Sequence, residues 1–243
     1  MNALTPLSEA TALPLTCAGL LPFDHPLFAG LPLSDIAEIG SVMSCHRFKD
    51  DALIAADDVP LVGIILAGAV ARIAQQGDQV STVGLLLPND LLILEGPRTA
   101  AIHPEAVGLT EILGCSAPEF DALLRRFPKL QLNYLDLVAS ELQATREWYT
   151  LLGRKTAPER VATLILKLSR HSDHPDSPVI DLRLTRDRIG TLLGLKMETV
   201  SRQIRAFAKL GIIALFSPTK IEVLDHGALM HATGDVWREK TML

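Results

Sequence analysis

The stretch LTRDRIGTLLGLKMETVSRQIRAFAKLGII, residues 184–213, constrains the fold more than any other part of the chain. It holds two short apolar-periodic runs separated by GLKM, and its charged residues are mostly arginine and lysine. Thr185 is a suitable N-cap for a first helix over residues 186–193, and Gly194 can adopt the positive φ that ends a helix at little cost. A second helix over residues 197–210 follows. The stretch therefore predicts a pair of helices joined by a glycine turn.

The second helix of this pair has two chemically distinct faces. Val200, Ile204 and Phe207 recur at i, i+4 and i+7 and form a stripe for burial. The residues of another face are polar: Glu198, Ser201 and Arg202. Arginine can donate two hydrogen bonds to guanine, glutamate can accept one from the amino group of cytosine, and serine can contact bases. We therefore predict that these three side chains read base pairs in a DNA major groove.

Other residues of the helix pair are suited to the DNA backbone. The candidate phosphate contacts are Arg186, Lys196, Thr199 and Arg205. In the first helix, Gly190 permits the close approach of two helix backbones that a helix-turn-helix crossing requires. The alternative is a solvated helix surface, on which Glu and Arg four residues apart form an ordinary ion pair. The hairpin predicted within IIALFSPTKIEVL, after the helices, is more specific than the charges and favours DNA binding.

Charge is distributed unevenly along the 243 residues, whose formal net charge is −5. Residues 1–60 hold eight acidic and two basic residues, a net charge of −6, whereas residues 183–209 hold seven basic and two acidic residues, a net charge of +5. An acidic first part with a basic module near the C-terminus suits a protein whose attraction to phosphate is confined to one face.

The first half of the chain has the pattern of a small β-fold. A short helix is expected near residues 33–39, capped by Ser34 or Asp35. From about residue 42 to 120, turn signals such as QGD and PND separate the β-rich segments LVGIILAGAVARIAQ, QVSTVGLLLP and AVGLTEILGCS. This spacing favours a compact antiparallel barrel or roll. Helices are then predicted to begin near Pro118, Pro128 and Pro158, and a short strand at VIDLRL leads into the helix pair.

A long helix from Pro128 to about Gly153 carries a heptad pattern. Its apolar seam consists of Leu135, Val138, Leu142, Thr145, Tyr149 and Leu152. A helix of about 25 residues is roughly 38 Å long, more than a small domain needs to cover its own core. The seam therefore predicts self-association, with packing inside one subunit as the alternative.

The motif LTRDRIGTLLGLKMETVSRQI with the hairpin IIALFSPTKIEVLD closely resembles the winged helix-turn-helix of the Crp/Fnr family of bacterial transcription regulators. The resemblance extends upstream through ELQATREWYTLLGRKTAPERVATLI and covers nearly the whole chain. It implies an α+β fold: a sensor β-roll over residues 1–120, a dimerisation helix region over 121–153, a winged helix-turn-helix over 154–228 and a tail over 229–243. It also implies a homodimer that binds promoter DNA at a TTGAT-like palindrome, with Glu198, Ser201 and Arg202 as base readers and RNA polymerase as a partner.

The resemblance leaves the signal open. An Fnr-type [4Fe–4S] cluster needs four thiolates, and the chain has only three cysteines, Cys17, Cys45 and Cys115, so a cluster of the usual type is not expected. Cyclic AMP binding is also not expected, because NDLLILEGPRTAA keeps Arg98 and Thr99 of the phosphate cassette but is shortened and lacks a Gly-Glu in register.

Three possibilities then stand: a haem gas sensor, a cysteine-based redox sensor, and a regulator without a ligand. Haem is ranked first, because haem-containing regulators of denitrification that respond to nitric oxide belong to the same family and lack the cluster cysteines. The candidate axial ligands are His25, His46 and His103. This assignment implies control of anaerobic or nitrogen-oxide metabolism.

An enzyme is the distant alternative, in the form of a cupin-like metal site on the roll. The seven histidines show no facial metal-ligand spacing and no catalytic constellation is visible, so no enzyme activity is expected. The apolar runs are shorter than the roughly 18 residues of a membrane span. No signal peptide is recognisable, and a cytoplasmic location without membrane association is expected.

Overall fold

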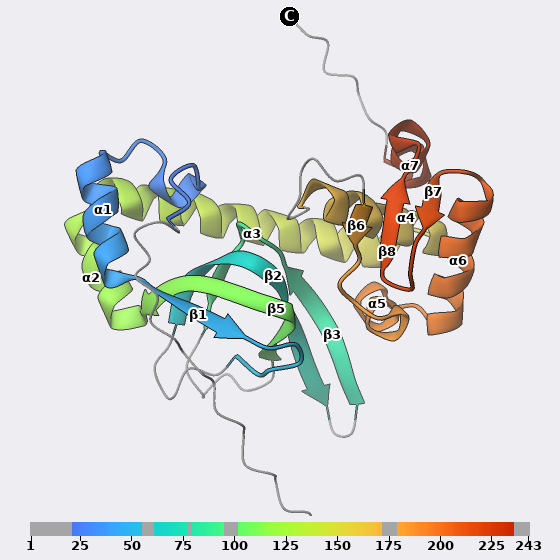
Figure 1. The fold of residues 1–243 in the computed structure, drawn as a ribbon, viewed down its shortest axis with the longest axis horizontal. Helices are drawn as coiled ribbons and strands as arrows, with labels where there is room; N and C mark the ends of the chain where they lie inside the picture. Colours follow the sequence, from blue (N-terminus) through green and yellow to red (C-terminus); the bar gives the residue numbers. More distant parts are fainter. Residues whose placement is uncertain (1–20, 55–60, 77–78, 95–101, 172–178, 236–243) are drawn as a thin grey trace, which may run out of the picture. The chain divides into compact units, whose positions relative to one another are not determined.

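The computed structural model describes residues 21–54, 61–76, 79–94, 102–171 and 179–235 (Figure 1). The chain divides into two compact units. An N-terminal unit comprises residues 1–72 and 85–138, and a C-terminal unit comprises residues 73–84 and 139–243. The α+β fold with an N-terminal antiparallel sheet and a C-terminal helix-turn-helix is the fold that the sequence predicts.

The antiparallel sheet has five strands, in the order β1-β5-β2-β3 with β4 also paired to β2. The strands are β1 (Ser44–Phe48), β2 (Leu61–Gln76), β3 (Gln79–Leu86), β4 (Leu91–Ile93) and β5 (Ile102–Ser116). The sequence predicts β2, β3 and the greater part of β5, but not β1 or β4 as separate strands. The segment SCHRF in β1 has no clear apolar alternation. It forms a strand because it pairs with β5.

Buried residues lie on both faces of this sheet. On one face, Phe48, Ile65 and Ile112 belong to a cluster that fills the interior of the roll. On the other face, Cys45, Leu113 and Cys115 pack with residues of the flanking helices. These helices are a 3-10 turn (Pro26–Phe28), α1 (Leu33–Val42), α2 (Ala117–Arg126) and the beginning of α3 (Pro128–Arg154). Buried apolar side chains therefore line both faces of the sheet.

The N-terminal ends of α2 and α1 can be compared with the caps and prolines that the sequence predicts. Ser116 caps α2 by accepting from the Glu119 backbone N–H, with Pro118 in the first turn as predicted. Helix α1 begins at Leu33 as expected, but the cap predicted at Ser34 or Asp35 is wrong. Its N-cap is Pro32, which makes no side-chain capping bond. The ring of Pro32 fixes its φ at −60°, and a ψ of 148° makes the residue extended directly before the helix.

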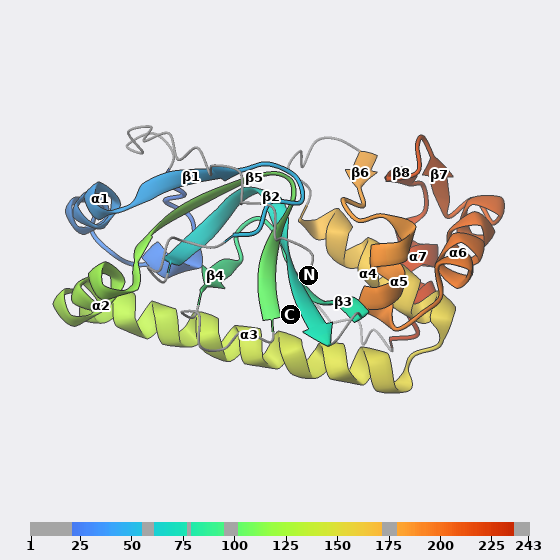
Figure 2. The same cartoon turned by 90° about the horizontal axis from the view of Figure 1, so that it is seen from below.

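The C-terminal unit contains α4 (Ala157–Arg170), α5 (Arg186–Leu193), α6 (Met197–Lys209), α7 (His226–Ala232) and a small sheet. The sheet has the order β6-β8-β7, formed by β6 (Val179–Asp181), β7 (Ile213–Leu215) and β8 (Lys220–Val223). Figure 2 shows α3 as one continuous helix. Among the helices of the described ranges, none combines the length and the apolar character that a membrane crossing needs.

Helix α7 is the element of this unit that the sequence did not predict. It runs across residue 228, the predicted end of the DNA-binding domain, into the predicted tail. The Asp225 side chain caps it by accepting from the Ala228 N–H at 2.8 Å, and Leu229 is fully buried. Residues as far as Ala232 therefore form part of a packed helix.

Candidate DNA-binding surface and dimer seam

The helix-turn-helix is formed by α5 and α6. Thr185 caps α5 as predicted, because its hydroxyl oxygen accepts from the Arg188 N–H at 3.3 Å. Gly194 ends α5 in the left-handed region with a φ of 62°. The turn is closed by the Leu195 N–H, which donates to the Gly190 carbonyl at 2.8 Å. The predicted glycine turn is therefore present, and it positions the start of α6.

Gly190 is needed where α5 meets the turn. A Cβ atom at this position would lie 2.7 Å from the carbonyl oxygen of Leu195, which is a backbone atom. The backbones can approach this closely only because the residue has no side chain. This confirms the reason given for Gly190 from the sequence.

Helix α6 has one buried face and one exposed face. Val200, Ile204 and Phe207 are at most 4% exposed, as their spacing predicts. On the other face, Glu198 and Arg202 are exposed and Ser201 is half-buried. The buried face fixes the rotation of the helix in its unit, so the three predicted base-reading side chains lie on its accessible side.

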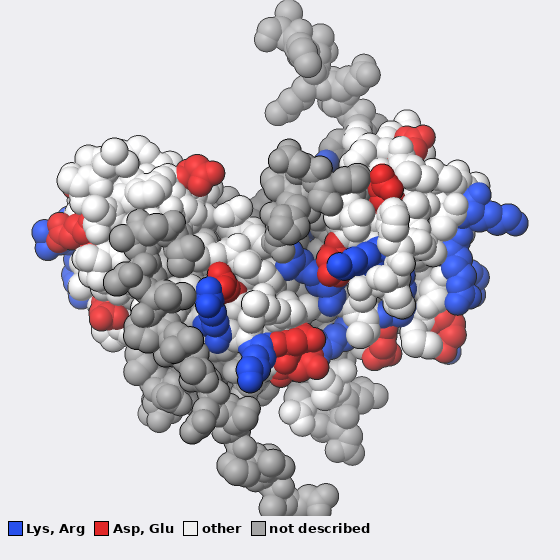
Figure 3. Space-filling view, viewed as in Figure 1, with Lys and Arg blue, Asp and Glu red and all other residues white. Residues whose placement is uncertain are grey.

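The predicted phosphate contacts surround this exposed face. Lys196 is the N-cap residue of α6 and is exposed, Arg205 is exposed, and Thr199 is half-buried in the first turn. Arg186, at the start of α5, is half-buried, and its Nη1 atom is buried without a hydrogen-bond partner in the described structure. Figure 3 shows Lys and Arg side chains gathered along the edge of the molecule where α6 lies.

The pKa of the Arg186 guanidinium is lowered, first by its burial and second by the positive charge of Arg205. Two neighbouring cations repel each other, and a nearby anion offsets that repulsion. A DNA phosphate at the exposed Arg205 would do so. The charges therefore suit the DNA-backbone contacts expected of Arg186 and Arg205.

The apolar seam predicted on α3 is exposed in the single chain. Tyr149 is 72% exposed, Leu135 54%, Leu142 52% and Val138 37%. Thr145 is also exposed and Leu152 is half-buried. Leu132, one turn before the predicted seam, is 58% exposed. An apolar stripe of this length in water is typical of a helix that pairs with another copy.

The three candidate haem ligands have different surroundings. His25 is buried, and both ring nitrogens already have partners: Nδ1 accepts from the Leu27 N–H at 3.1 Å, and Nε2 lies 3.0 Å from the Asn89 carbonyl. Both nitrogens of the His25 imidazole are therefore engaged within the protein in this structure. Burial, the largest effect, lowers the pKa of its imidazole.

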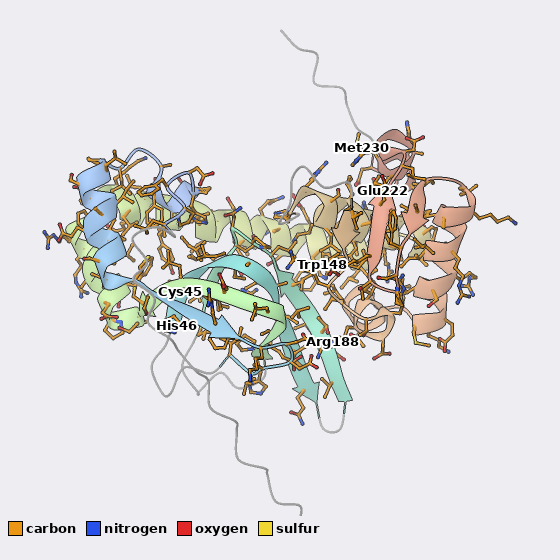
Figure 4. The ribbon with its side chains drawn as sticks, in the orientation of Figure 1. Cys45, His46, Trp148, Arg188, Glu222 and Met230 are labelled. Carbon is orange, nitrogen blue, oxygen red and sulfur yellow. The ribbon has the colours of Figure 1, made fainter. Side chains whose placement is uncertain are left out.

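His46 and His103 are half-buried residues of the roll. His46 is on β1, next to Cys45 (Figure 4), and its register partner Ile112 belongs to the cluster in the roll interior. Its Nε2 atom lies 2.8 Å from the Ser44 hydroxyl, and burial lowers the pKa of its imidazole. His103 is near the start of β5. In the described parts of the chain, no three His, Cys, Asp or Glu side chains are grouped so that they could hold a metal ion.

The cysteines that the structure describes are Cys45 and Cys115, and both are buried. Cys45 pairs with Leu113, so Cys115 lies two residues farther along β5 on the same face of the sheet. Burial, together with a smaller contribution from Glu119, raises the pKa of the Cys115 thiol to about 12. Such a thiol contains very little of the reactive thiolate. Cys17 and the Arg98–Thr99 pair lie outside the described residues.

Sequence reasoning did not identify Arg160, the fourth residue of α4. Its guanidinium donates to three backbone carbonyls, of Leu152, Lys155 and Leu193. The signal available in the sequence was weak, because an arginine in the first turn of a helix is usually solvated. Its role depends on helix ends that are brought together only by the fold.

Comparison with known proteins agrees with this architecture. A profile of the Crp-like helix-turn-helix domain matches residues 159–232. The transcriptional activator protein FnrL of Cereibacter sphaeroides is 34% identical over 189 residues, which cover 74% of this chain and 75% of FnrL. The fumarate and nitrate reduction regulatory protein of Vibrio cholerae is 33% identical over 187 residues, 74% of each chain.

Among solved structures, FixK2 from Bradyrhizobium japonicum has the same fold, with a TM-score of 0.71 and 24% identity. The match covers 81% of this chain and all of the FixK2 chain. The curated relatives reported above carry the names of transcriptional regulators and not of enzymes. This chain belongs to the Crp/Fnr family of DNA-binding transcription regulators.

Proposed function

We propose that the protein acts as a homodimer that binds a TTGAT-like palindrome in promoter DNA and thereby regulates transcription of genes for anaerobic or nitrogen-oxide metabolism. The observation that carries the proposal is the exposed face of α6, where Glu198, Ser201 and Arg202 lie opposite a fully buried stripe. Arg202 would donate to guanine, Glu198 would accept from cytosine, and Ser201 would contact a neighbouring base.

The exposed stripe on α3 supports a dimer. Pairing two copies along Leu135, Leu142 and Tyr149 would bury apolar side chains that are more than half exposed in one chain. A two-fold dimer presents two copies of α6, and a palindrome has the same symmetry. RNA polymerase is the further partner implied, since a transcription regulator acts by helping or hindering polymerase at the promoter.

The names of the relatives support the physiological part of the proposal. The Vibrio relative is named for fumarate and nitrate reduction, and a relative from Haemophilus influenzae, 32% identical over 187 residues, is named an anaerobic regulatory protein. The matched part of the Haemophilus protein covers 74% of this chain and 72% of the relative.

DNA binding can be tested by fluorescence anisotropy with a labelled TTGAT-like palindrome and a scrambled duplex of equal length. The palindrome should bind at least about 10³-fold more tightly, the lower range for specific DNA binding. With Arg186, Lys196 and Arg205 on each protomer near phosphates, affinity should fall about 10³-fold between 50 and 200 mM salt. Equal affinity for both duplexes would contradict the proposal.

For the signal, we propose that it acts at the β-roll, with haem as the favoured cofactor and His46 as its candidate axial ligand. His46 is preferred to His25 because the imidazole of His25 is fully engaged, and to His103 because the register partner of His46 lies in the roll interior. When bound, haem would supply an iron centre that takes up nitric oxide. A redox switch at Cys45 or Cys115 is disfavoured by the burial of both thiols.

The haem proposal predicts that purified protein mixed with hemin gives a Soret band distinct from that of free hemin, and that nitric oxide shifts it. Replacing His46 by Ala should remove the distinct spectrum, whereas replacing the exposed His226 should leave it unchanged. A spectrum identical to free hemin would exclude haem and leave a regulator without a ligand as the alternative within the family.

A further inference from the structure

Arg160 ties together three helix ends in the C-terminal unit. Its Nε atom donates to the Lys155 carbonyl at 2.9 Å, Nη1 donates to the Leu193 carbonyl at 2.8 Å, and Nη2 donates to the Leu152 carbonyl at 2.7 Å. Each of the three guanidinium nitrogens therefore has a backbone acceptor.

The three acceptors share one physical property. Leu152 is in the last turn of α3, Lys155 directly follows that helix, and Leu193 is the last residue of α5. The final carbonyls of a helix have no partner within the helix and carry the negative end of its dipole. A guanidinium is a permanent cation with several donors in a fixed plane, so it can satisfy separate carbonyls at once.

The guanidinium also lies against the turn between α5 and α6. A Cβ atom at Gly194 would be 3.4 Å from the Nη1 atom of Arg160. Arg160 therefore connects two places: the C-terminal end of α3, which carries the dimer seam, and Gly194, where the chain turns into α6. Leu152, whose carbonyl it binds, is itself a member of that seam.

We propose that Arg160 is a positioning residue for DNA recognition. It fixes α5, and through the turn at Gly194 also α6, relative to the C-terminal end of α3. In a dimer joined along α3, this orientation sets the distance between the two base-reading helices, and hence the half-site spacing that the protein accepts. The inference rests on the proposed function, because only a dimer on a palindrome has a spacing preference.

The test compares the wild-type protein with Arg160→Lys. Lysine keeps the positive charge but replaces three donors in a fixed plane by one flexible ammonium group, which cannot bridge three carbonyls in the same way. The matched control is Arg154→Lys, at the exposed last residue of α3. Dissociation constants are measured by anisotropy for the palindrome, for palindromes with one base pair added or removed between the half-sites, and for a single half-site.

The wild-type protein and the Arg154→Lys variant should prefer one spacing. In Arg160→Lys, the affinity for that spacing should fall about tenfold, the effect expected from losing hydrogen bonds of a charged group, and the differences between spacings should disappear. Affinity for the single half-site and the dimer mass measured by light scattering should stay as in the wild type.

The other possible results separate a failure of the inference on Arg160 from a failure of the proposed function. If Arg160→Lys keeps the wild-type preference for one spacing, the inference is wrong. If it weakens binding to all duplexes equally, including the half-site, Arg160 has only a general structural role and the inference is also wrong. If the wild-type protein binds the palindrome no better than the half-site, the proposed function itself fails.

Discussion

At the scale of single residues, Gly190 and His25 show how local chemistry sets the architecture. Gly190 has no Cβ, and only for that reason can the Leu195 carbonyl come so close to α5. His25 is buried as a neutral ring with a partner for each nitrogen, and it links the 3-10 turn to the segment around Asn89. Both residues contribute to stability and neither contacts DNA in the proposal.

Replacing Gly190 by Ala should destabilise the helix-turn-helix. The added methyl group would meet a backbone oxygen at 2.7 Å, so the helices must shift apart. Overpacking of this kind costs about 1–3 kcal/mol of unfolding free energy. Denaturant titration measures this loss. Gly153→Ala, at a helix glycine with open space around its Cβ position, is the matched control and should not destabilise the protein.

The burial of His25 makes stability depend on pH. Because its pKa is below the ordinary value of 6.5 in the folded protein, the unfolded chain binds the proton more readily. Stability should therefore be undiminished above about pH 7 and should fall as the pH drops below about 6.5. Melting temperatures between pH 7.5 and 5.5 measure this effect. In His25→Gln the contribution is absent, so an unchanged pH slope in this variant would contradict the assignment.

At the scale of secondary-structure elements, α3 and α6 are both two-faced helices. In α6, one face packs within the unit and the other is free. In α3, Leu130 and Asn133 are buried while Leu132 and Leu135 are exposed, so the same separation holds near its start. The helical period of the apolar residues in the sequence specifies the two faces of a helix directly. It does not specify what covers the exposed face.

Placing a charge on the seam should disrupt the dimer without unfolding the chain. Leu142 is 52% exposed in one protomer, so Leu142→Glu leaves the monomer core intact. A carboxylate in the seam would have to be buried without a partner, which should weaken dimerisation by roughly 1–3 kcal/mol. Sedimentation velocity measures the dimer fraction over a concentration series.

The matched control for this variant is Ala144→Glu, at an exposed position on the other side of α3. It adds the same charge to the same helix and should leave the dimer fraction unchanged. Equal dimer fractions for wild-type protein and Leu142→Glu would show that the seam does not hold the dimer.

The sequence predicted α5, the glycine turn, α6 and the span of α3 closely, because helical periodicity, caps and prolines are local signals. It did not predict β1, β4 or α7. The strand SCHRF depends on its pairing with β5, and HGALMHA depends on the burial of Leu229. Arg160 was missed for the same reason. Its acceptors are backbone carbonyls, which have no signature in the sequence.

At the scale of the whole molecule, the acidic net charge of −5 coexists with a basic helix-turn-helix. Repulsion between the acidic part of the chain and phosphate disfavours random contact with DNA, while the basic segment of residues 183–209 supplies the attraction. A dimer doubles the number of these contacts and adds the requirement for two half-sites at one spacing. In the proposed dimer, selectivity would arise from base reading, symmetry and charge placement together.

The most direct test of base reading by α6 in a dimer is a base-pair substitution scan of the palindrome with wild-type protein and Arg202→Ala. For the wild type, exchanging the guanine-cytosine pair in either half-site should cost about 1–3 kcal/mol of binding free energy, equally in both halves. Arg202→Ala should bind both sequences alike at that position while still forming a dimer. If Arg202→Ala discriminates at that base pair as the wild type does, α6 does not read DNA as proposed.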